Sequence, residues 1–412
     1  QLDKQCEDMD AALFDVDGDG DLDLYVVSGG NEFPAHSISY QDRLYINDGK
    51  GVFSKSKTHL PLFKESGSCV RPFDFDRDGD IDLFIGGRLV PRDYPSPASS
   101  FILENKDGKF ENVTEQVAPT LNNIGLVTDA LWSDADQDGD ADLLLVGEWM
   151  PPTILRNEDG KLAKAAPLVN SVGWWYSIAA ADLDNDGDDD YLLGNLGLNY
   201  KYKASKSEPF SVHYDDFDGS GTKDIVLSYY NFGEQFPLRG RSCSSEQVPM
   251  LQEKFETYDL FASSNLKEVY GAGPLAQALH FEATTFESMW VENAGNSQFK
   301  PHSLPVEAQF SSINDFLIRD FNQDGHQDIL LAGNLYASEI ETPRNDAGVG
   351  LLLLGDGKGH FSVVPGRDSG FFVPYDIKDV ALVKTSNGVL VLCAANNESI
   401  QVFSLESSKP AN

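Results

Sequence analysis

The chain of 412 residues carries 31 basic and 66 acidic side chains, so its formal net charge is −35 at pH 7. A surface this acidic repels a phosphate backbone, which argues against nucleic-acid binding. No stretch approaches the length of apolar sequence that crosses a bilayer as a helix, so the sequence predicts no transmembrane segment. The hydrophobic content of 41% is sufficient for an ordered core.

Six short acidic runs of the form D-x-D-x-D-G-x-x-D recur along the chain, each between two strand-like stretches. The runs begin at Asp15, Asp74, Asp134, Asp182, Asp216 and Asp320. Side-chain oxygens at alternating positions converge where the backbone turns tightly, and a glycine at position 6 permits that turn. This arrangement suits a hard cation, so we expect structural Ca²⁺, about six ions with one in each loop.

Within each loop, positions 1, 3, 5 and 9 are expected to offer side-chain oxygens, and position 7 a backbone carbonyl, with water completing the shell. The candidate metal-binding residues are Asp15, Asp17, Asp19, Asp21 and Asp23; Asp74, Asp76, Asp78, Asp80 and Asp82; Asp134, Asp136, Asp138, Asp140 and Asp142; Asp182, Asp184, Asp186, Asp188 and Asp190; Asp216, Asp218, Ser220, Thr222 and Asp224; and Asp320, Asn322, Asp324, His326 and Asp328. The fifth and sixth loops depart from the acidic pattern, so their sites are expected to be weaker.

An EF-hand opens in the same way but places a bidentate glutamate at position 12. Position 12 is aliphatic in all six loops: Val26, Ile85, Leu145, Leu193, Leu227 and Leu331. These residues lie in short apolar runs such as LDLYVV and ADLLLVG, which are typical of strands. Each cation is therefore expected to bridge two strands of a hairpin, and a helix–loop–helix is excluded.

A second pattern follows several loops and consists of a strand, a glycine-rich turn and another strand. Examples are LYINDGKGVF at 44–53, ILENKDGKF at 102–110 and ILRNEDGKL at 154–162. Together with the preceding hairpin this makes four strands, the content of one propeller blade. The sequence thus predicts an all-β fold, a seven-bladed β-propeller with calcium loops in six blades, as a single domain over residues 1–412.

The last blade is expected in residues 376–405, without metal, and residues 1–9 are expected to pair with it to close the ring. Two intervals between loops are irregular. The interval after Asp182 is short, so the outer edge of the fourth blade is expected to be reduced to a loop at 194–203. The interval before Asp320 is long and contains a helical insertion at about 237–280, with a helix start at Asn265 followed by Glu268.

Four cysteines, Cys6, Cys69, Cys243 and Cys393, lie far apart without metal-type spacing. We expect them to be buried free thiols. Calcium loops of modest affinity fill where free calcium is near millimolar, which favours a location outside the cytosol.

The six repeated loops resemble the FG-GAP or VCBS repeat family, which includes the integrin α-chain propeller and many bacterial surface proteins. More narrowly, four stretches resemble the cartilage-acidic-protein-like VCBS proteins of Bacteroidetes, which are commonly larger than this chain: ALFDVDGDGDLDLYVVSGG, VGEWMPPTIL, GWWYSIAAADLDNDGDDDYLLGNLGLN and LRGRSCSSEQVP. The resemblance covers nearly the whole chain. It implies a seven-bladed calcium-bearing propeller that is extracellular or at the bacterial cell surface or outer membrane, beside nutrient importers, with the periplasm as a second location. No ligand-binding residue carries over.

The expected function is a binding or scaffold protein that engages a protein or glycan, and not an enzyme. The alternative is a polysaccharide lyase, whose base and carboxylate clamp would come from His36 with Tyr40, His213 with Tyr214, and Arg239 with Arg241. No nucleophile motif or catalytic-metal motif is present in the sequence.

Aromatic residues lie near several junctions of loop and strand. Trp149, Trp174, Trp175 and Tyr176 offer surfaces on which a sugar could stack if they are exposed, and otherwise pack the blades. Trp132 and Trp290 fall inside strand-like runs and are expected in the core.

Overall fold

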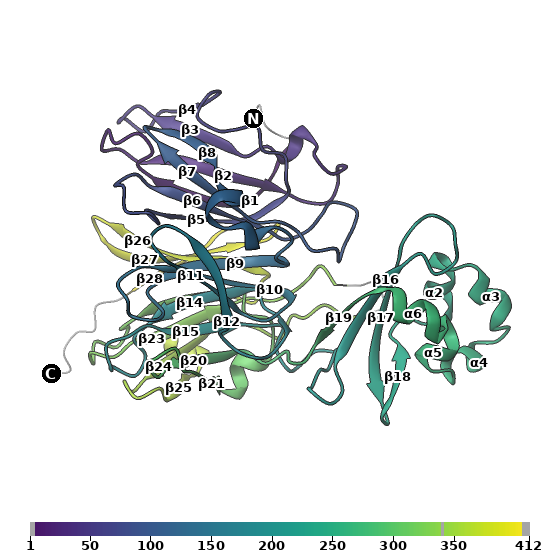
Figure 1. Ribbon diagram of the computed structural model, residues 1–412. Helices are drawn as coiled ribbons and strands as arrows, with labels where there is room; N and C mark the ends of the chain where they lie inside the picture. Colours follow the sequence, from purple (N-terminus) through teal and green to yellow (C-terminus); the bar gives the residue numbers. More distant parts are fainter. Residues whose placement is uncertain (1–4, 339–341, 406–412) are drawn as a thin grey trace.

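The computed structural model describes residues 5–338 and 342–405 and consists of repeated antiparallel sheets, with a group of short helices at one side (Figure 1). All six acidic loops join two adjacent antiparallel strands. The glycine-rich turns join the next two strands of the same sheets. Both hairpin predictions are therefore confirmed.

The described residues form seven sheets, which we list in chain order. They are β1 (Glu7–Phe14), β2 (Asp23–Gly29), β3 (Arg43–Asn47) and β4 (Phe53–Lys55); β5 (Gly67–Phe73), β6 (Asp82–Gly87), β7 (Phe101–Lys106) and β8 (Lys109–Asn112); β9 (Leu126–Ser133), β10 (Asp142–Met150), β11 (Thr153–Asn157), β12 (Leu162–Pro167) and β13 (Gly173–Trp174); β14 (Ser177–Ala181), β15 (Asp190–Gly194), β20 (Met289–Asn293) and β21 (Phe299–Ser303); β16 (Phe210–Asp215), β17 (Asp224–Asn231), β18 (Glu234–Pro237) and β19 (Leu279–Ala283); β22 (Asp315–Arg319), β23 (Asp328–Ala332), β24 (Leu351–Gly355) and β25 (Phe361–Val364); and β26 (Ile377–Thr385), β27 (Gly388–Ala395) and β28 (Gln401–Ser404).

Six of these sheets lie side by side in the manner of propeller blades. Their first strands, β1, β5, β9, β14, β22 and β26, contact one another in that order. At three of the five junctions, an aspartate carboxylate accepts a hydrogen bond from a backbone N–H of the next sheet. These bonds join Asp10 to Val70 at 3.0 Å, Asp129 to Ile178 at 2.9 Å, and Asp315 to Val380 at 2.6 Å.

The core lies between adjacent sheets, and this explains the unbroken apolar runs after each loop. Every residue of β6 and β10 is buried, because each second strand has neighbouring sheets on both faces. Successive side chains of a strand point to opposite faces. Leu83 and Ile85 accordingly pack with Val27 of the first sheet, whereas Phe84 packs with Leu143 of the third.

The sheet of β16–β19 is inserted within another sheet, and this corrects the expected order of seven blades. Strand β15 pairs with β20, which follows the whole inserted sheet in the chain. The fourth sheet therefore obtains its outer strands from residues 289–303, and the expectation of an edge reduced to the loop 194–203 is wrong. The fifth acidic loop belongs to the inserted sheet, which projects to one side in Figure 1.

The helical insertion lies where the sequence predicts it. Its helices are α2 (Arg241–Gln247), α3 (Met250–Lys254), α4 (Tyr258–Ala262), α5 (Leu266–Tyr270) and α6 (Ala272–Gln277). The capping box of Asn265 and Glu268 is present at the start of α5. The helices cover the inserted sheet through contacts that include Val226 with Leu266 and Leu275. Short helical turns elsewhere are α1 (Thr114–Val117), α7 (Gly366–Ser369), η1 (Ile38–Tyr40), η2 (Pro119–Leu121) and η3 (Val306–Gln309).

The last sheet has three strands, and the expected pairing that closes the ring is absent from the described residues. In that part of the chain, β1 pairs with β2, and β28 pairs with β27. Residues 1–4, which the closure prediction included, lie outside the described residues.

Two further sequence predictions concern thiols and membrane segments. All four cysteines are free thiols as expected, but only Cys69 and Cys393 are buried, whereas Cys6 and Cys243 are half-buried. Among the helices in residues 5–338 and 342–405, none is long and apolar enough to cross a membrane.

Candidate metal centres

All six acidic loops adopt the same turn. The carboxylate at position 1 accepts a hydrogen bond from the backbone N–H of the glycine at position 6, at 2.7 to 3.2 Å. The φ angles of these glycines lie between 84° and 101°, a region that other residues rarely adopt. The predicted reason for glycine at position 6 is therefore correct.

In five loops, three carboxylates bring one oxygen each to within 4.8 Å of the others. The first three loops use positions 1, 3 and 5, and the fourth and fifth use positions 1, 3 and 9. These triads are Asp15, Asp17 and Asp19; Asp74, Asp76 and Asp78; Asp134, Asp136 and Asp138; Asp182, Asp184 and Asp190; and Asp216, Asp218 and Asp224. In the sixth loop the Asn322 amide donates to Asp324 at 2.9 Å, so this loop differs from the other five.

Several loop carboxylates have a buried oxygen with no hydrogen-bond partner in the structure. They are Asp21, Asp74, Asp82, Asp134, Asp142 and Asp188. A buried carboxylate oxygen without a partner is costly, and a cation among the triads would satisfy it. Two of the six, Asp21 and Asp188, occupy position 7, where the sequence analysis expected only a backbone carbonyl.

The carboxylate at position 9 also holds the sheet together, a role that the sequence analysis missed. Asp190 accepts hydrogen bonds from the backbone N–H of Leu183 at 3.1 Å and of Asn293, on β20, at 2.9 Å. The Asp23 carboxylate likewise accepts hydrogen bonds from the backbone N–H groups of Val16 and Asn47. Position 9 therefore fixes the start of its own loop and the third strand of its sheet.

Burial raises the pKa of the position 9 carboxyls of Asp82 and Asp190 to about 7, and that of Asp142 to about 6. The cause is that a low-dielectric environment disfavours the charged form. A divalent cation in the loop would favour the ionised form of these groups, so their surroundings fit a bound metal ion.

Asparagines of the second pattern link the first three loops to the next sheet. The side-chain amides of Asn105, Asn157 and Asn293 donate to backbone carbonyls in the acidic loop of the preceding sheet, at 2.9, 2.8 and 3.3 Å. The motif N-x-D-G, visible in LENKDG and LRNEDG, could have identified this contact. The acidic loops are thus packed between sheets and are not free surface turns.

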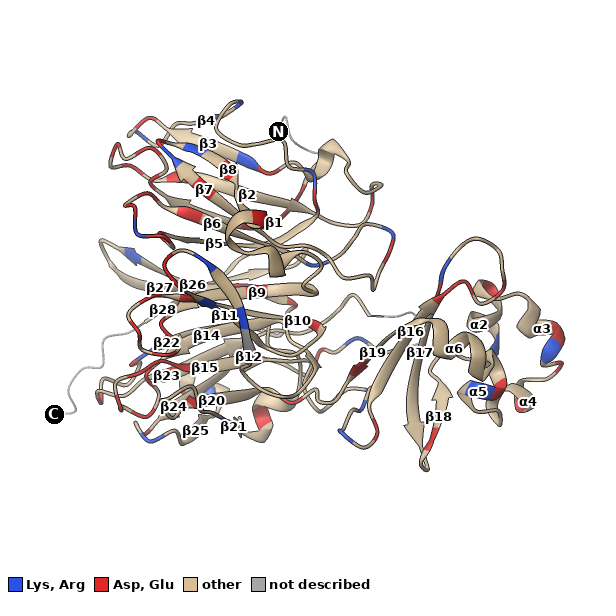
Figure 2. Cartoon of the chain, viewed as in Figure 1, with Lys and Arg blue, Asp and Glu red and all other residues tan. Residues whose placement is uncertain are grey.

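Neighbouring loops also contact one another through positions 4 and 7. Arg77 pairs with Asp140 at 2.5 Å, and the Gln137 amide donates to Asp188 at 2.7 Å. Asn185 of the fourth loop contacts His326 of the sixth at 2.9 Å, so the sixth loop follows the fourth around the ring. These loops form an acidic rim, at the left of Figure 2, on the side opposite the inserted sheet.

The residue pairs considered for catalysis do not converge. His36 pairs with Glu65 at 2.8 Å, whereas the Tyr40 hydroxyl donates to the Phe33 carbonyl. His213 stacks on His280, and the Tyr214 hydroxyl donates to Asp93 at 2.7 Å. Arg241 donates to the Phe255 carbonyl within the helical insertion. His36 and Tyr40 lie between β2 and β3 of the first sheet, whereas His213, Tyr214 and Arg241 belong to the inserted sheet and its helices.

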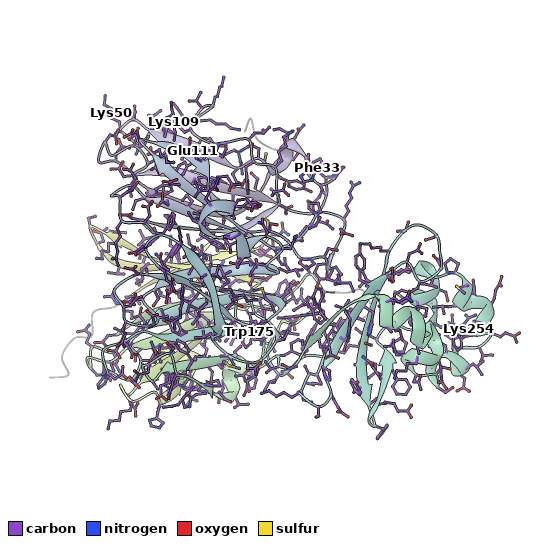
Figure 3. All side chains as sticks on the ribbon, in the orientation of Figure 1. Phe33, Lys50, Lys109, Glu111, Trp175 and Lys254 are labelled. Atoms are coloured by element: carbon purple, nitrogen blue, oxygen red, sulfur yellow. The ribbon has the colours of Figure 1, made fainter. Side chains whose placement is uncertain are left out.

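The tryptophans considered for sugar stacking mostly pack the interior. Trp149 and Trp175 are buried, and Trp174 is half-buried against Trp149, Phe210 and Phe286, with ring centroids 5.1 to 5.7 Å apart. Trp175 lies in the body of the stacked sheets, toward the inserted sheet, in Figure 3. The core prediction is correct for Trp290, which is buried, whereas Trp132 is half-buried. Trp149 and Trp175 therefore pack the interior of the sheets and are not available for stacking on a sugar.

We expect the buried His213 to make the inserted sheet sensitive to acid. Its ring stacks on His280 with centroids 4.1 Å apart, and burial lowers its pKa to about 4. In the unfolded chain a histidine has a pKa of about 6.5, so the unfolded state binds a proton first as the pH falls. We expect the inserted sheet to lose up to about 3 kcal/mol between pH 6.5 and 4. Hydrogen exchange of residues 210–283 at several pH values measures this loss, which His213→Phe should abolish; an unchanged pH dependence in that variant would contradict it.

Two segments of the chain match the FG-GAP-like repeat family, residues 15–85 and 134–193. Each segment begins at one acidic loop and ends in the strand that follows the next loop. No curated protein matches this sequence.

The solved structures that are similar to the chain at low identity include a lectin, a biofilm matrix protein and a lyase. An Agrocybe aegerita lectin that recognises non-reducing terminal N-acetylglucosamine shares 13% identity over 97% of this chain and 81% of its own, with a TM-score of 0.47. The V. cholerae biofilm matrix protein Bap1 shares 10% identity over 97% of this chain and 77% of its own, with a TM-score of 0.35. The exotype rhamnogalacturonan lyase YesX shares 12% identity over 98% of this chain and 56% of its own, with a TM-score of 0.40. Similarity at this level gives no basis for transferring a ligand or a reaction.

Proposed function

We propose that this chain, in which two segments match the FG-GAP-like repeat, is a calcium-stabilised binding or scaffold protein of the VCBS type. It acts outside the cell or at the bacterial cell surface or outer membrane, where it engages a protein or a glycan. Calcium is structural in this proposal, and the protein is not an enzyme.

The observation that carries the proposal is the convergence of carboxylates in five loops, together with buried carboxylate oxygens that lack a partner in the first four of them. Two like charges about 4 Å apart repel by about 1 kcal/mol even in water, and by more where they are partly buried. A divalent cation turns this repulsion into attraction. Because the loops are packed between sheets, cation binding would stabilise the arrangement of the sheets as well as the loops.

The side opposite the acidic rim is the candidate surface for a protein or glycan, because the inserted sheet and its helices project from it (Figure 2). The side chains considered for a lyase make other local contacts: His36 pairs with Glu65, His213 stacks on His280, and Arg241 donates to the Phe255 carbonyl. Incubation with uronate-containing polysaccharides tests the proposal that the protein is not an enzyme. Unsaturated sugar products would overturn it, and their absence is the expected result.

Counting bound calcium tests the proposal directly. We expect about five bound ions, one for each triad, with weaker binding in the fifth loop than in the first four, and the weakest binding at the sixth loop. Metal analysis after dialysis gives the count, and calorimetric titration gives the affinities. The variant Asp17→Ala should lose one ion, whereas Glu158→Gln, which alters an exposed carboxylate outside the loops, should lose none. A native chain that binds no calcium would refute the proposal.

A further inference from the structure

In four sheets, the fourth strand contributes one large apolar side chain to the space between its own sheet and the preceding one. These side chains are Phe110 of β8, Leu162 of β12, Phe299 of β21 and Phe361 of β25. Each belongs to a core cluster that also contains position 2 of the preceding acidic loop, namely Val16, Phe75, Ala135 or Leu183. The fourth strand therefore completes the junction between two sheets, and does not only extend its own sheet.

The last sheet has no fourth strand within the described residues, and a cavity of about 770 Å³ lies at the corresponding place. One wall of the cavity comes from the preceding sheet and includes Phe321, which is position 2 of its acidic loop, together with Leu352. The other wall comes from β27 and β28 and includes Val391 and Phe403. At the other four junctions, the corresponding place is filled by a phenylalanine or leucine of the fourth strand.

Within residues 5–338 and 342–405, no strand pairs with the outer edge of β28. Its residues, QVFS, carry no charge, and Ile400 and Val402 are 61% and 55% exposed. Edge strands of soluble proteins are normally blunted by lysine, proline or a bulge, and an uncharged apolar edge is a template for pairing with another strand.

We propose that the edge of β28 binds an extended segment of a partner polypeptide as a fourth strand, and that the cavity receives an aromatic or leucine side chain of that segment. Backbone hydrogen bonds to β28 would provide affinity, and the cavity would select the side chain. The net charge of −35 favours a neutral or basic segment over an acidic one. This proposal concerns a binding edge and does not rest on calcium or on the surface that carries the inserted sheet.

A labelled peptide with the sequence of residues 359–365, GHFSVVP, tests the proposal, because it reproduces the fourth strand of the neighbouring sheet. Fluorescence anisotropy with the full chain in calcium buffer should show saturable binding. Replacing the phenylalanine of the peptide by alanine should weaken binding about tenfold or more, because the cavity would lose its occupant. Absence of saturable binding, or equal binding of both peptides, would overturn the proposal.

Two protein variants locate the binding edge. Val402→Lys places a charge on the edge strand and should reduce peptide affinity about tenfold, whereas Val383→Lys, at a 37% exposed position of β26 in the same sheet, should leave it unchanged. Circular dichroism confirms that both variants are folded.

Two other occupants of the β28 edge must be distinguished from a partner polypeptide: residues 406–412 of the same chain and a second copy of the protein. A chain that ends at Leu405 should bind the peptide as the full chain does, and much tighter binding would show that residues 406–412 compete for the edge. Sedimentation of the full chain should show no association that Val402→Lys abolishes, since such association would identify a second copy as the occupant. Either of these results would overturn the proposal.

Discussion

Removing calcium should lower the melting temperature of this protein by on the order of 10 °C. A ligand that binds only the folded state stabilises it by about 1.4 kcal/mol when its concentration is tenfold above the dissociation constant. The structure has five carboxylate triads, so their combined contribution is about 7 kcal/mol. For a chain of this length, 1 kcal/mol corresponds to about 1 to 2 °C. Differential scanning calorimetry with excess chelator, followed by titration with calcium, measures the effect.

The fall in melting temperature should depend on calcium binding to the acidic loops and not on ionic strength. Glu158→Gln should show the same difference in melting temperature with and without calcium as the native chain. In Asp17→Ala this difference should be smaller by about the contribution of one site. Magnesium should restore less of the melting temperature, because it requires a smaller and more regular octahedral shell than these loops present. An unchanged melting temperature in chelator would show that calcium does not stabilise these loops.

The hairpins around the acidic loops could be predicted because their determinants are local. The alternation of carboxylates, the glycine at position 6 and the strand-like flanks all lie within about one hairpin, and the shared hydrogen bond from that glycine to position 1 follows from them. The helix start at Asn265 was predictable for the same reason, because a capping box involves residues only three positions apart.

The order of the sheets could not be predicted because it depends on contacts between distant residues. The apolar run of β15 resembles those of β6 and β10, and nothing in it indicates that its partner β20 lies beyond an inserted sheet. The number of residues between two loops does not indicate which strands pair with each other. The fifth loop was therefore placed in the ring, although the contact between Asn185 and His326 joins the fourth loop to the sixth.

The candidate sites show the same division between local and distant determinants. Positions 1, 3 and 5 gather in the first three loops as expected, because the turn itself brings them together. The second role of position 9 depends on the third strand, and the buried oxygens at position 7 depend on the neighbouring sheets. Likewise, the burial of Trp149 depends on Phe210 of the inserted sheet, which stacks on it at 6.0 Å.

Asp129→Ala should destabilise the protein by about 3 kcal/mol, the largest effect that we expect from a single substitution outside the acidic loops. Asp129 is 9% exposed and lies on β9, between the second and fourth sheets. Its carboxylate pairs with Arg71 of β5 on one side and accepts the backbone N–H of Ile178 of β14 on the other. Removing the carboxylate would leave that N–H without its acceptor and Arg71 with one fewer partner.

Arg71 extends this network of contacts to the first sheet, so four sheets are joined here and not only a single ion pair. Its guanidinium also donates to Asp10 of β1 at 2.7 Å and to the Ala130 carbonyl at 2.7 Å. Because Arg71 is one-third exposed and keeps these partners, we expect a loss nearer 3 than 5 kcal/mol. Asp129→Asn retains an acceptor for Ile178 and should cost less, and Glu158→Ala, at an exposed carboxylate, should change stability by less than about 0.5 kcal/mol. Urea unfolding of the three variants in calcium gives the comparison, and equal stability of Asp129→Ala and Glu158→Ala would show that this junction does not hold the first four sheets together.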